Sequence, residues 1–357
     1  MTFQGGRDIA TTSFVEDAYD DLRFFIEDCD SFGGLVVTTN ADDAYAGIAS
    51  EYMSFLQDEL GSSSPLLVFS VHDINRVCTT SAASYFNRNF YHKREALWAQ
   101  NEAKLIGSCI ELSAEYVPLS SCPISQISSI YATVGNLFHS SSILGLAMDV
   151  SLMSIQQNLS LAGLLSALRP APFASVASLA SIFPNSMTHL EYGLGMVRTR
   201  GVVNFSSIWS MSPAGHMPKS SMFSGISRSS FNEVVAACGL GYPLPVFSNI
   251  VQPVTIPVPH PKIFDSSLER NRSTSGKAIA KEKTQGPSEV EQVAVVAGLA
   301  TNKDDACPGL ASLGDSLCPG NRSSRAQSAA RSLGVEDDDL RETAEVLRSR
   351  ADDYATL

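Results

Sequence analysis

The chain has 357 residues, with 25 Lys and Arg against 37 Asp and Glu, so its formal net charge is −12. A hydrophobic fraction of 44% beside a charged fraction of 17% supports a large buried core and excludes a wholly disordered chain. The acidic balance argues against nucleic acid as the main partner, because phosphate binding needs clustered basic side chains.

The ends and the cysteines indicate a reducing compartment. Residues 1–20 show neither the basic segment nor the continuous apolar segment of a secretory signal. No stretch offers the about 20 mostly apolar residues of a membrane span. The seven cysteines are odd in number and form no C-x-x-C pair, which predicts free thiols. We therefore expect a protein of the cytosol or of the cytosolic face of an organelle.

The first part of the chain alternates between helical and strand patterns. The predicted elements are helices over 16–30 and 44–60 and strands over 35–39 and 66–71. We expect Gly33 and Gly34 to end the first helix and Gly61 the second. A strand, a helix and a second continuous apolar strand predict a parallel βαβ crossover, and with it an α/β sheet.

Further elements follow along the chain. The patterns predict a helix over 101–116, a strand over 117–119 and a long buried helix over 130–153. The two Cys-Pro-Gly segments, at Cys307 and at Cys318, predict turns.

Changes in composition divide the chain into consecutive parts. The predicted division is a disordered leader over 1–15, an α/β domain over 16–154, a second α+β domain over 155–264, a flexible linker or loop over 265–292 and a C-terminal segment over 293–357.

The C-terminal segment ends in a predicted helix. Its apolar stripe consists of Leu340, Ala344, Leu347, Ala351 and Tyr354. Two interpretations are open: a helix docked on its own domain, or a partner helix that forms a seam with another chain.

One segment resembles a known superfamily. Cys29-Asp30-Ser31-Phe32-Gly33-Gly34-Leu35 follows a helix with Arg23-Phe24-Phe25, and this arrangement is similar to the tubulin superfamily, where such a segment enters a central strand. In that superfamily the strand runs into the phosphate loop G-G-G-T-G-S-G. The forms RFFIEDCDSFGG and FLQDEL resemble the Misato family in particular, as do His139 to Leu144 and Gly334 to Leu340.

The resemblance implies a fold and a role. It implies a tubulin-like partial parallel sheet with flanking helices, so that residues 16–154 would be the remnant of a nucleotide domain with a central helix. It implies a non-enzymatic scaffold in mitochondrial distribution, morphology and inheritance, in the cytoplasm and at the outer mitochondrial membrane. The implied partners are cytoskeletal or outer-mitochondrial-membrane proteins, with no nucleic acid, no transmembrane segment and, at most, peripheral membrane association.

The phosphate loop of the resemblance is degraded in this sequence. Spacing from Cys29 places it on Asp42, Asp43, Ala44, Tyr45, Ala46, Gly47 and Ile48. Phosphate loops need glycines for close backbone approach, and one glycine remains. Two carboxylates beside a triphosphate repel it by about 4 kcal/mol each at 4 Å and an effective dielectric constant near 20.

We therefore expect no cofactor, no metal and no catalytic residue, with GTP disfavoured. The alternative is a GTP-binding or GTP-hydrolysing assembly protein of tubulin type, in which a metal ion bridges the two carboxylates.

Three further expectations complete the analysis. Because family members have strands ahead of this helix, we expect the chain to be N-terminally truncated, with strand 35–39 left as a bare edge. His72-Asp73 predicts a solvated loop at a strand end. Asn101-Glu102-Ala103 superficially resembles a guanine-contacting tubulin segment and stays unassigned.

Overall fold

The computed structural model divides into two compact units, which are treated separately. Unit 1 comprises residues 1–119, 160–177 and 302–357, and unit 2 comprises 120–159 and 178–301. The structure describes residues 2–61, 64–72, 88–121, 124, 130–133, 135–157, 160–169, 171, 175–183, 202–206, 220–224, 246–250, 254–265, 287–288, 292–293, 295–301, 303–317 and 337–356.

A parallel three-stranded sheet forms the centre of unit 1. Its strands are β1 (Leu35–Asn40), β2 (Leu66–His72) and β3 (Glu115–Ser120), in the order β1-β2-β3. β1 pairs with β2 in parallel, with Leu35 opposite Leu66. All residues of β3, and all of β2 except Val71, are buried. Strands buried on both faces are typically continuous apolar runs. Residues 66–69 of β2 form such a run, whereas β3 begins with the buried Glu115.

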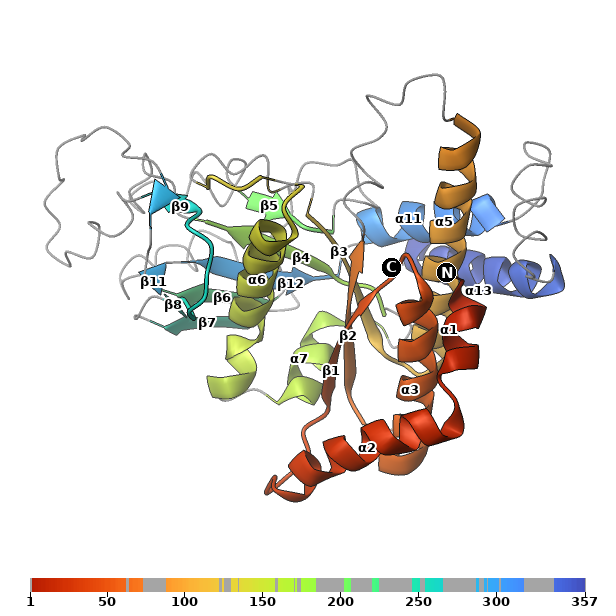
Figure 1. Ribbon diagram of the computed structural model, residues 1–357, viewed down its shortest axis with the longest axis horizontal. Coiled ribbons are helices and arrows are strands. Elements are labelled where there is room, and N and C mark those ends of the chain that lie inside the picture. Colours follow the sequence, from red (N-terminus) through yellow and green to blue (C-terminus); the bar gives the residue numbers. More distant parts are fainter. Residues whose placement is uncertain are drawn as a thin grey trace, which may run out of the picture. The chain divides into compact units, whose positions relative to one another are not determined.

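Helices flank this sheet. The helices of unit 1 are α1 (Phe3–Ile9), α2 (Thr12–Glu27), α3 (Ala44–Leu60), α5 (Arg88–Glu111), α7 (Leu161–Leu168), α11 (Lys303–Leu317) and α13 (Asp337–Ala355). α1, α3 and α5 pack against one another on one side of the sheet (Figure 1). α11 and α13 pack together and against α5, so the end of the chain completes this unit.

Unit 2 is built on a five-stranded sheet. Its strands are β4 (Ser178–Ile182), β5 (Val202–Asn204), β6 (Ser220–Ser224), β7 (Val246–Ile250) and β12 (Val296–Ala300), in the order β5-β4-β12-β6-β7. Only β6 and β7 pair in parallel among these. The helix α6 (Leu137–Gln157) lies across this sheet (Figure 1).

Two small antiparallel sheets complete unit 2. β8 (Val254–Thr255) pairs with β11 (Gln292–Val293), and β9 (Phe264–Asp265) pairs with β10 (Pro287–Ser288). Most of the predicted linker 265–292 lies outside the described residues.

The α/β fold class and the parallel crossover are confirmed. Helix α3 has the predicted bounds, and Gly61 ends it with a positive φ of 92°. The first predicted helix ends earlier than expected, at Glu27, with Asp28 as its C-cap residue. Gly34 instead makes the turn into β1: its φ is 122°, and an added Cβ would lie 2.6 Å from Pro65 O. A side chain at this position would meet backbone.

Four further expectations differ from the structure. Residues 3–9 and 12–15 are helical rather than part of a disordered leader, with Phe3 and Val15 buried. The helix predicted from Asn101 to Tyr116 begins at Arg88 and ends at Glu111, and Tyr116 lies in β3. The helix predicted from Ile130 begins at Leu137. Cys307-Pro308-Gly309 lies inside α11 instead of a turn, while the segment at Cys318 lies outside the described residues.

The terminal helix docks on its own unit. Its predicted apolar stripe is buried throughout, from Leu340 at 4% exposed to Tyr354 at 0%. Tyr354 Oη receives the backbone N–H of Val176 at 2.8 Å. This face of α13 is therefore not available for a seam with another chain.

None of the described helices has the length and hydropathy of a membrane span.

Candidate functional site

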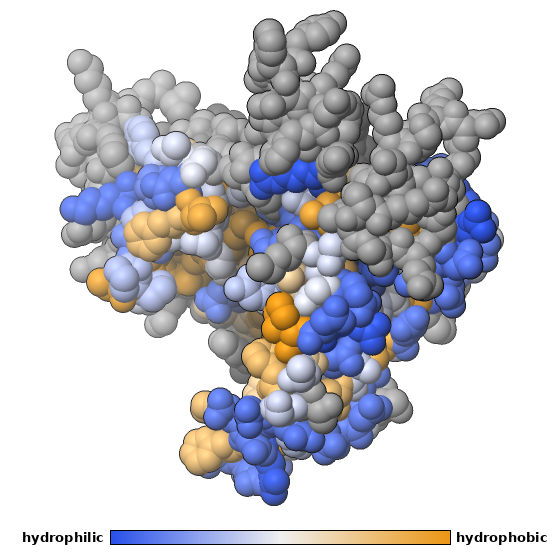
Figure 2. Space-filling model, turned by 45° about the vertical axis from the view of Figure 1, so that its right-hand side comes forward, coloured by the Kyte–Doolittle hydropathy of each residue, from blue (hydrophilic) through white to orange (hydrophobic). Residues whose placement is uncertain are grey.

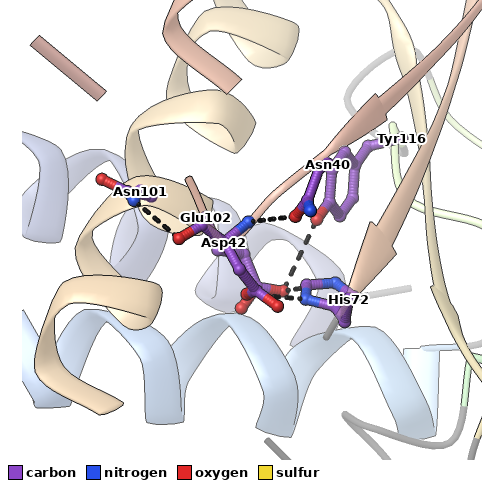
Figure 3. A network of polar contacts seen from close by, with 6 residues as sticks. All are labelled: Asn40, Asp42, His72, Asn101, Glu102 and Tyr116. Carbon is purple, nitrogen blue, oxygen red and sulfur yellow. Dashed lines mark hydrogen bonds and ion pairs between the residues drawn. The ribbon is translucent and has the colours of Figure 1, made fainter. Parts of the chain in front are cut away.

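The candidate site lies where β1 and β2 end and α3 begins. In open α/β sheets, ligands bind outside the carboxyl ends of parallel strands, which makes this edge the first place to examine. Six polar residues meet there, as Figure 3 shows: Asn40, Asp42, His72, Asn101, Glu102 and Tyr116. They come from β1, the β1–α3 connection, β2, α5 and β3.

A buried imidazole lies between two buried carboxylates at the centre of the site. His72 Nδ1 is 3.3 Å from Asp42 Oδ1, and His72 Nε2 is 3.3 Å from Glu102 Oε1 (Figure 3). The three side chains are at most 3% exposed.

Hydrogen bonds to the backbone fix the position of Asp42. Asn40 Oδ1 accepts the N–H of Asp42 at 2.8 Å, and Asn101 Nδ2 donates to its carbonyl oxygen at 3.0 Å. Asn101 Oδ1 in turn accepts the N–H of Phe3 at 2.8 Å, which ties the start of α1 to the same cluster. Tyr116 Oη donates to Glu102 Oε1 at 3.5 Å.

The residues expected to replace the phosphate loop are mostly helical. Ala44, Tyr45, Ala46, Gly47 and Ile48 form the start of α3 rather than a loop. Asp43 is the N-cap of this helix, and its carboxylate accepts the N–H of Tyr45 at 2.9 Å. The Tyr45 side chain is 63% exposed.

The two expected acidic residues therefore point to different partners. Asp42 faces the interior and His72, while Asp43 caps α3. The positive end of a helix dipole favours an anion at this position, and the anion here is the protein's own carboxylate. An aspartate cap stabilises a helix by about 1 kcal/mol.

Helix α1 occupies the surface next to the start of α3. A Cβ added at Gly47 would lie 2.0 Å from Phe3 O, and one added at Gly6 would lie 1.9 Å from Ala44 O. Glycine at both positions lets the two backbones approach this closely. Arg7 Nε adds a partly exposed ion pair to Glu51 Oε2 at 2.7 Å. The glycine that remains from the expected phosphate loop thus serves a helix–helix contact.

Three residues of the site were not expected from the sequence. His72 was predicted in a solvated loop, but it is the last residue of β2 and 2% exposed; Asp73 lies outside the described residues. Asn101 and Glu102 stayed unassigned and are both buried here. Their place in one stripe with buried Leu105 and Cys109 was the available signal that they face the interior.

The cluster connects several elements of unit 1. Among the residues that the structure describes, no three His, Cys, Asp or Glu side chains are grouped to hold a metal ion. The cluster joins two strand ends, α5 and the start of α1 through buried polar contacts. Such a network fixes the relative placement of the elements that it connects.

Comparison with known proteins agrees with this architecture. A family model for the tubulin domain matches residues 15–156. Protein dml1 of Schizosaccharomyces pombe is 35% identical over 113 residues, which cover 31% of this chain and 22% of that protein. Protein misato homolog 1 of Danio rerio is 27% identical over 159 residues, which cover 43% of this chain and 25% of that protein. Protein dml1 of Aspergillus oryzae is 27% identical over 129 residues, which cover 36% of this chain and 23% of that protein.

The parallel sheet, its flanking helices and the matched range together define a tubulin domain. Within this class, the matched part of the chain is similar to the Misato/DML1 family, as the sequence resemblance predicted. The chain spans about a quarter or less of the length of these relatives.

Proposed function

We propose that this chain is a tubulin-domain scaffold that acts through protein contacts and does not bind GTP at the start of α3. One observation carries the proposal: Asp43 caps α3 with its own carboxylate while α1 packs against Gly47. A triphosphate at this place would have to displace α1 and would meet the negative charge of Asp43. The cost of bringing like charges to about 4 Å is about 4 kcal/mol at an effective dielectric constant near 20.

The buried cluster supports the same proposal. A catalytic imidazole or carboxylate has to reach a substrate, and His72, Asp42 and Glu102 are almost fully enclosed. Their partners are one another and neighbouring backbone or tyrosine groups. A non-enzymatic role accounts for this arrangement without a substrate.

The proposed cellular role is the one that the family resemblance implies. We place the chain in mitochondrial distribution, morphology and inheritance, in the cytoplasm and in association with the outer mitochondrial membrane. Protein partners on the cytoskeleton or on that membrane would provide the association.

A second candidate function is GTP binding of the tubulin type. The observation in its favour is position: α3 begins at the carboxyl end of β1, where α/β proteins bind ligands. In this alternative, α1 would have to leave the start of α3 before the nucleotide could bind.

Nucleotide content separates the two candidates. The full chain is purified in buffer with magnesium and without added nucleotide, then denatured, and the supernatant is analysed by ion-exchange chromatography. The scaffold proposal expects far less than one guanine nucleotide per chain. Near-stoichiometric GTP or GDP would contradict it and favour the second candidate.

The cellular role has its own test. Cells that lack the endogenous gene are imaged with a mitochondrial stain, with and without expression of this chain. Restored mitochondrial distribution is the expected result. Unchanged distribution, at a matched expression level, would contradict the mitochondrial role and leave the nucleotide result standing.

A further inference from the structure

Two adjacent phenylalanines of α2 are exposed to solvent. Phe24 is 71% exposed and Phe25 is 65% exposed, the highest values among the phenylalanines that the structure describes. Their rings contact each other edge to face, with centroids 5.6 Å apart. An exposed aromatic pair is a feature that monomeric surfaces seldom keep and that interfaces concentrate.

The helix geometry places Phe24 inside a ring of carboxylates. Residues three and four positions apart are neighbours on a helix surface. For Phe24 these neighbours are Asp20, Asp21, Glu27 and Asp28, and all four are exposed. We call Phe24 and Phe25 with these four residues the Phe24 face. Aromatic residues inside a polar rim are the usual composition of a protein–protein interface.

The opposite side of α2 packs on α3, so the helix cannot rotate to bury Phe24 and Phe25. The Tyr19 ring packs edge to face on Phe55 of α3 at 5.6 Å, and Tyr52 Oη donates to Ala18 O at 3.1 Å. Val15 is buried on the same side of α2. These contacts fix the rotation of α2, so Phe24 stays on the outward side.

The negative charge around Phe24 and Phe25 limits which partners can bind there. Asp20, Asp21, Glu27 and Asp28 contribute four negative charges, and Arg23 pairs with Glu27 at 2.6 Å, which leaves a net charge of −3 on this stretch. Figure 2 shows a small apolar patch beside hydrophilic surface at its lower end, where α2 lies in Figure 1. A second copy of the same face, or an anionic lipid surface, would meet like charge.

We propose that the Phe24 face docks a basic segment of another protein, one that offers apolar side chains or an apolar hollow to the two rings and Lys or Arg to the rim. The rings supply the buried contact, and the carboxylates select a positively charged partner and orient it. This inference rests on the proposed role of the chain as a protein scaffold and names the surface that would perform it.

The chain carries a reporter beside this face. Cys29 is exposed, lies four residues after Phe25, and its Sγ donates to Phe25 O at 3.1 Å. A partner seated on Phe25 would cover Cys29. Slower alkylation of Cys29, measured on its own tryptic peptide by mass spectrometry, therefore reports docking at this place.

The test uses the full chain and a fluorescein-labelled peptide built of Leu-Leu-Lys-Lys repeats, with fluorescence anisotropy as the readout. A matched peptide with Glu in place of every Lys is the charge control. We expect the Lys peptide to bind, to slow the alkylation of Cys29 and to lose affinity in high salt, while the Glu peptide does not bind.

Variants locate the binding. Phe24→Ala/Phe25→Ala should lower the affinity for the Lys peptide by about tenfold or more, because a few aromatic side chains supply most of the binding energy in such contacts. Phe14→Ala is the matched control: it is 45% exposed on the same helix, about 15 Å away along the axis, and should change affinity by less than about twofold. Asp20→Asn/Asp21→Asn removes two rim charges without touching the rings and should also weaken binding.

Several results would overturn the inference. Absence of binding, equal binding of the Glu peptide, unchanged affinity of Phe24→Ala/Phe25→Ala or unchanged alkylation of Cys29 would each do so. None of these results bears on GTP binding. The scaffold proposal is tested separately, by the nucleotide content of the purified chain. Because the changed residues are exposed, circular dichroism of the variants should match that of the parent chain.

Discussion

His72 Nδ1 lies 3.3 Å from Asp42 Oδ1, and this contact joins the end of β2 to the residues that follow β1. On the opposite side of the ring, Nε2 faces Glu102 of α5 at the same distance. One imidazole thus links three elements of the tubulin domain. The position that would hold a nucleotide in an open α/β site here holds a closed set of the protein's own charges.

Removing the central imidazole should destabilise the domain. In His72→Leu, the carboxylates of Asp42 and Glu102 would stay buried without the ring between them. Breaking such a buried arrangement costs about 3 to 5 kcal/mol, so we expect about 3 kcal/mol less free energy of unfolding in urea titrations. His139→Leu is the matched control, since His139 is only partly buried and accepts one hydrogen bond, from Thr133 N–H. Its loss should be about 1 kcal/mol. Equal losses would contradict the central role of His72.

Substitution of two glycines by alanine should change stability in opposite directions, because Gly47 lies in the contact between α1 and α3 and Gly107 does not. Gly47→Ala should lower stability and free α1, because its Cβ would lie 2.0 Å from Phe3 O. Gly107→Ala in α5 has open space around it and should raise stability by about 1 kcal/mol through helix propensity. Trypsin cleavage after Arg7 measures the release of α1. Cleavage at the parent rate in Gly47→Ala would show that α1 does not pack there.

Another buried carboxylate depends on an arginine. Arg169 Nε donates to Glu115 Oε2 at 2.8 Å, and Glu115 is fully buried in β3. Arg169→Ala removes the cation beside this carboxylate and should cost about 3 kcal/mol in urea titrations. Arg341→Ala, which breaks an exposed pair with Asp338, should change stability by less than about 0.5 kcal/mol. Similar costs for both variants would contradict the importance of burial.

Two described cysteines should differ sharply in reactivity. Burial raises the pKa of the Cys109 thiol far above its ordinary value, and Glu115 adds to this shift, so the reactive thiolate is suppressed. Cys29 is exposed. Iodoacetamide at neutral pH should label Cys29 in the native chain, leave Cys109 unlabelled and label both in urea, as peptide mass spectrometry can measure. Native labelling of Cys109 would show that this part of α5 opens readily.

The sequence predicted elements well where local signals agree. Helix α3 was placed at its observed bounds because an apolar helical stripe and Gly61 mark its body and end; that Asp43 is its N-cap came from the structure. The strands β1 and β2 were placed from their continuous apolar runs. Here the local preferences and the tertiary packing favour the same structure.

The candidate site was harder to predict because its residues come from segments that are far apart in the sequence. His72-Asp73 after a strand has the composition of a solvated turn, and only the partners from the β1–α3 connection and α5 make His72 a buried residue. Tyr116 continued the helical spacing of Leu105, Cys109 and Leu112 by coincidence, while the chain turns at Ser113, where φ is 52°. The helix α1 was missed because two adjacent glycines weaken its helical signal, and its packing on Gly47 compensates for them.

A titration of the full chain with magnesium GTP tests the central claim most directly. The closed start of α3 predicts no saturable heat in isothermal titration calorimetry up to about 100 μM nucleotide, and the same result for magnesium ATP as the control. A saturable, magnesium-dependent isotherm for GTP with a micromolar Kd, absent for ATP, would contradict the account.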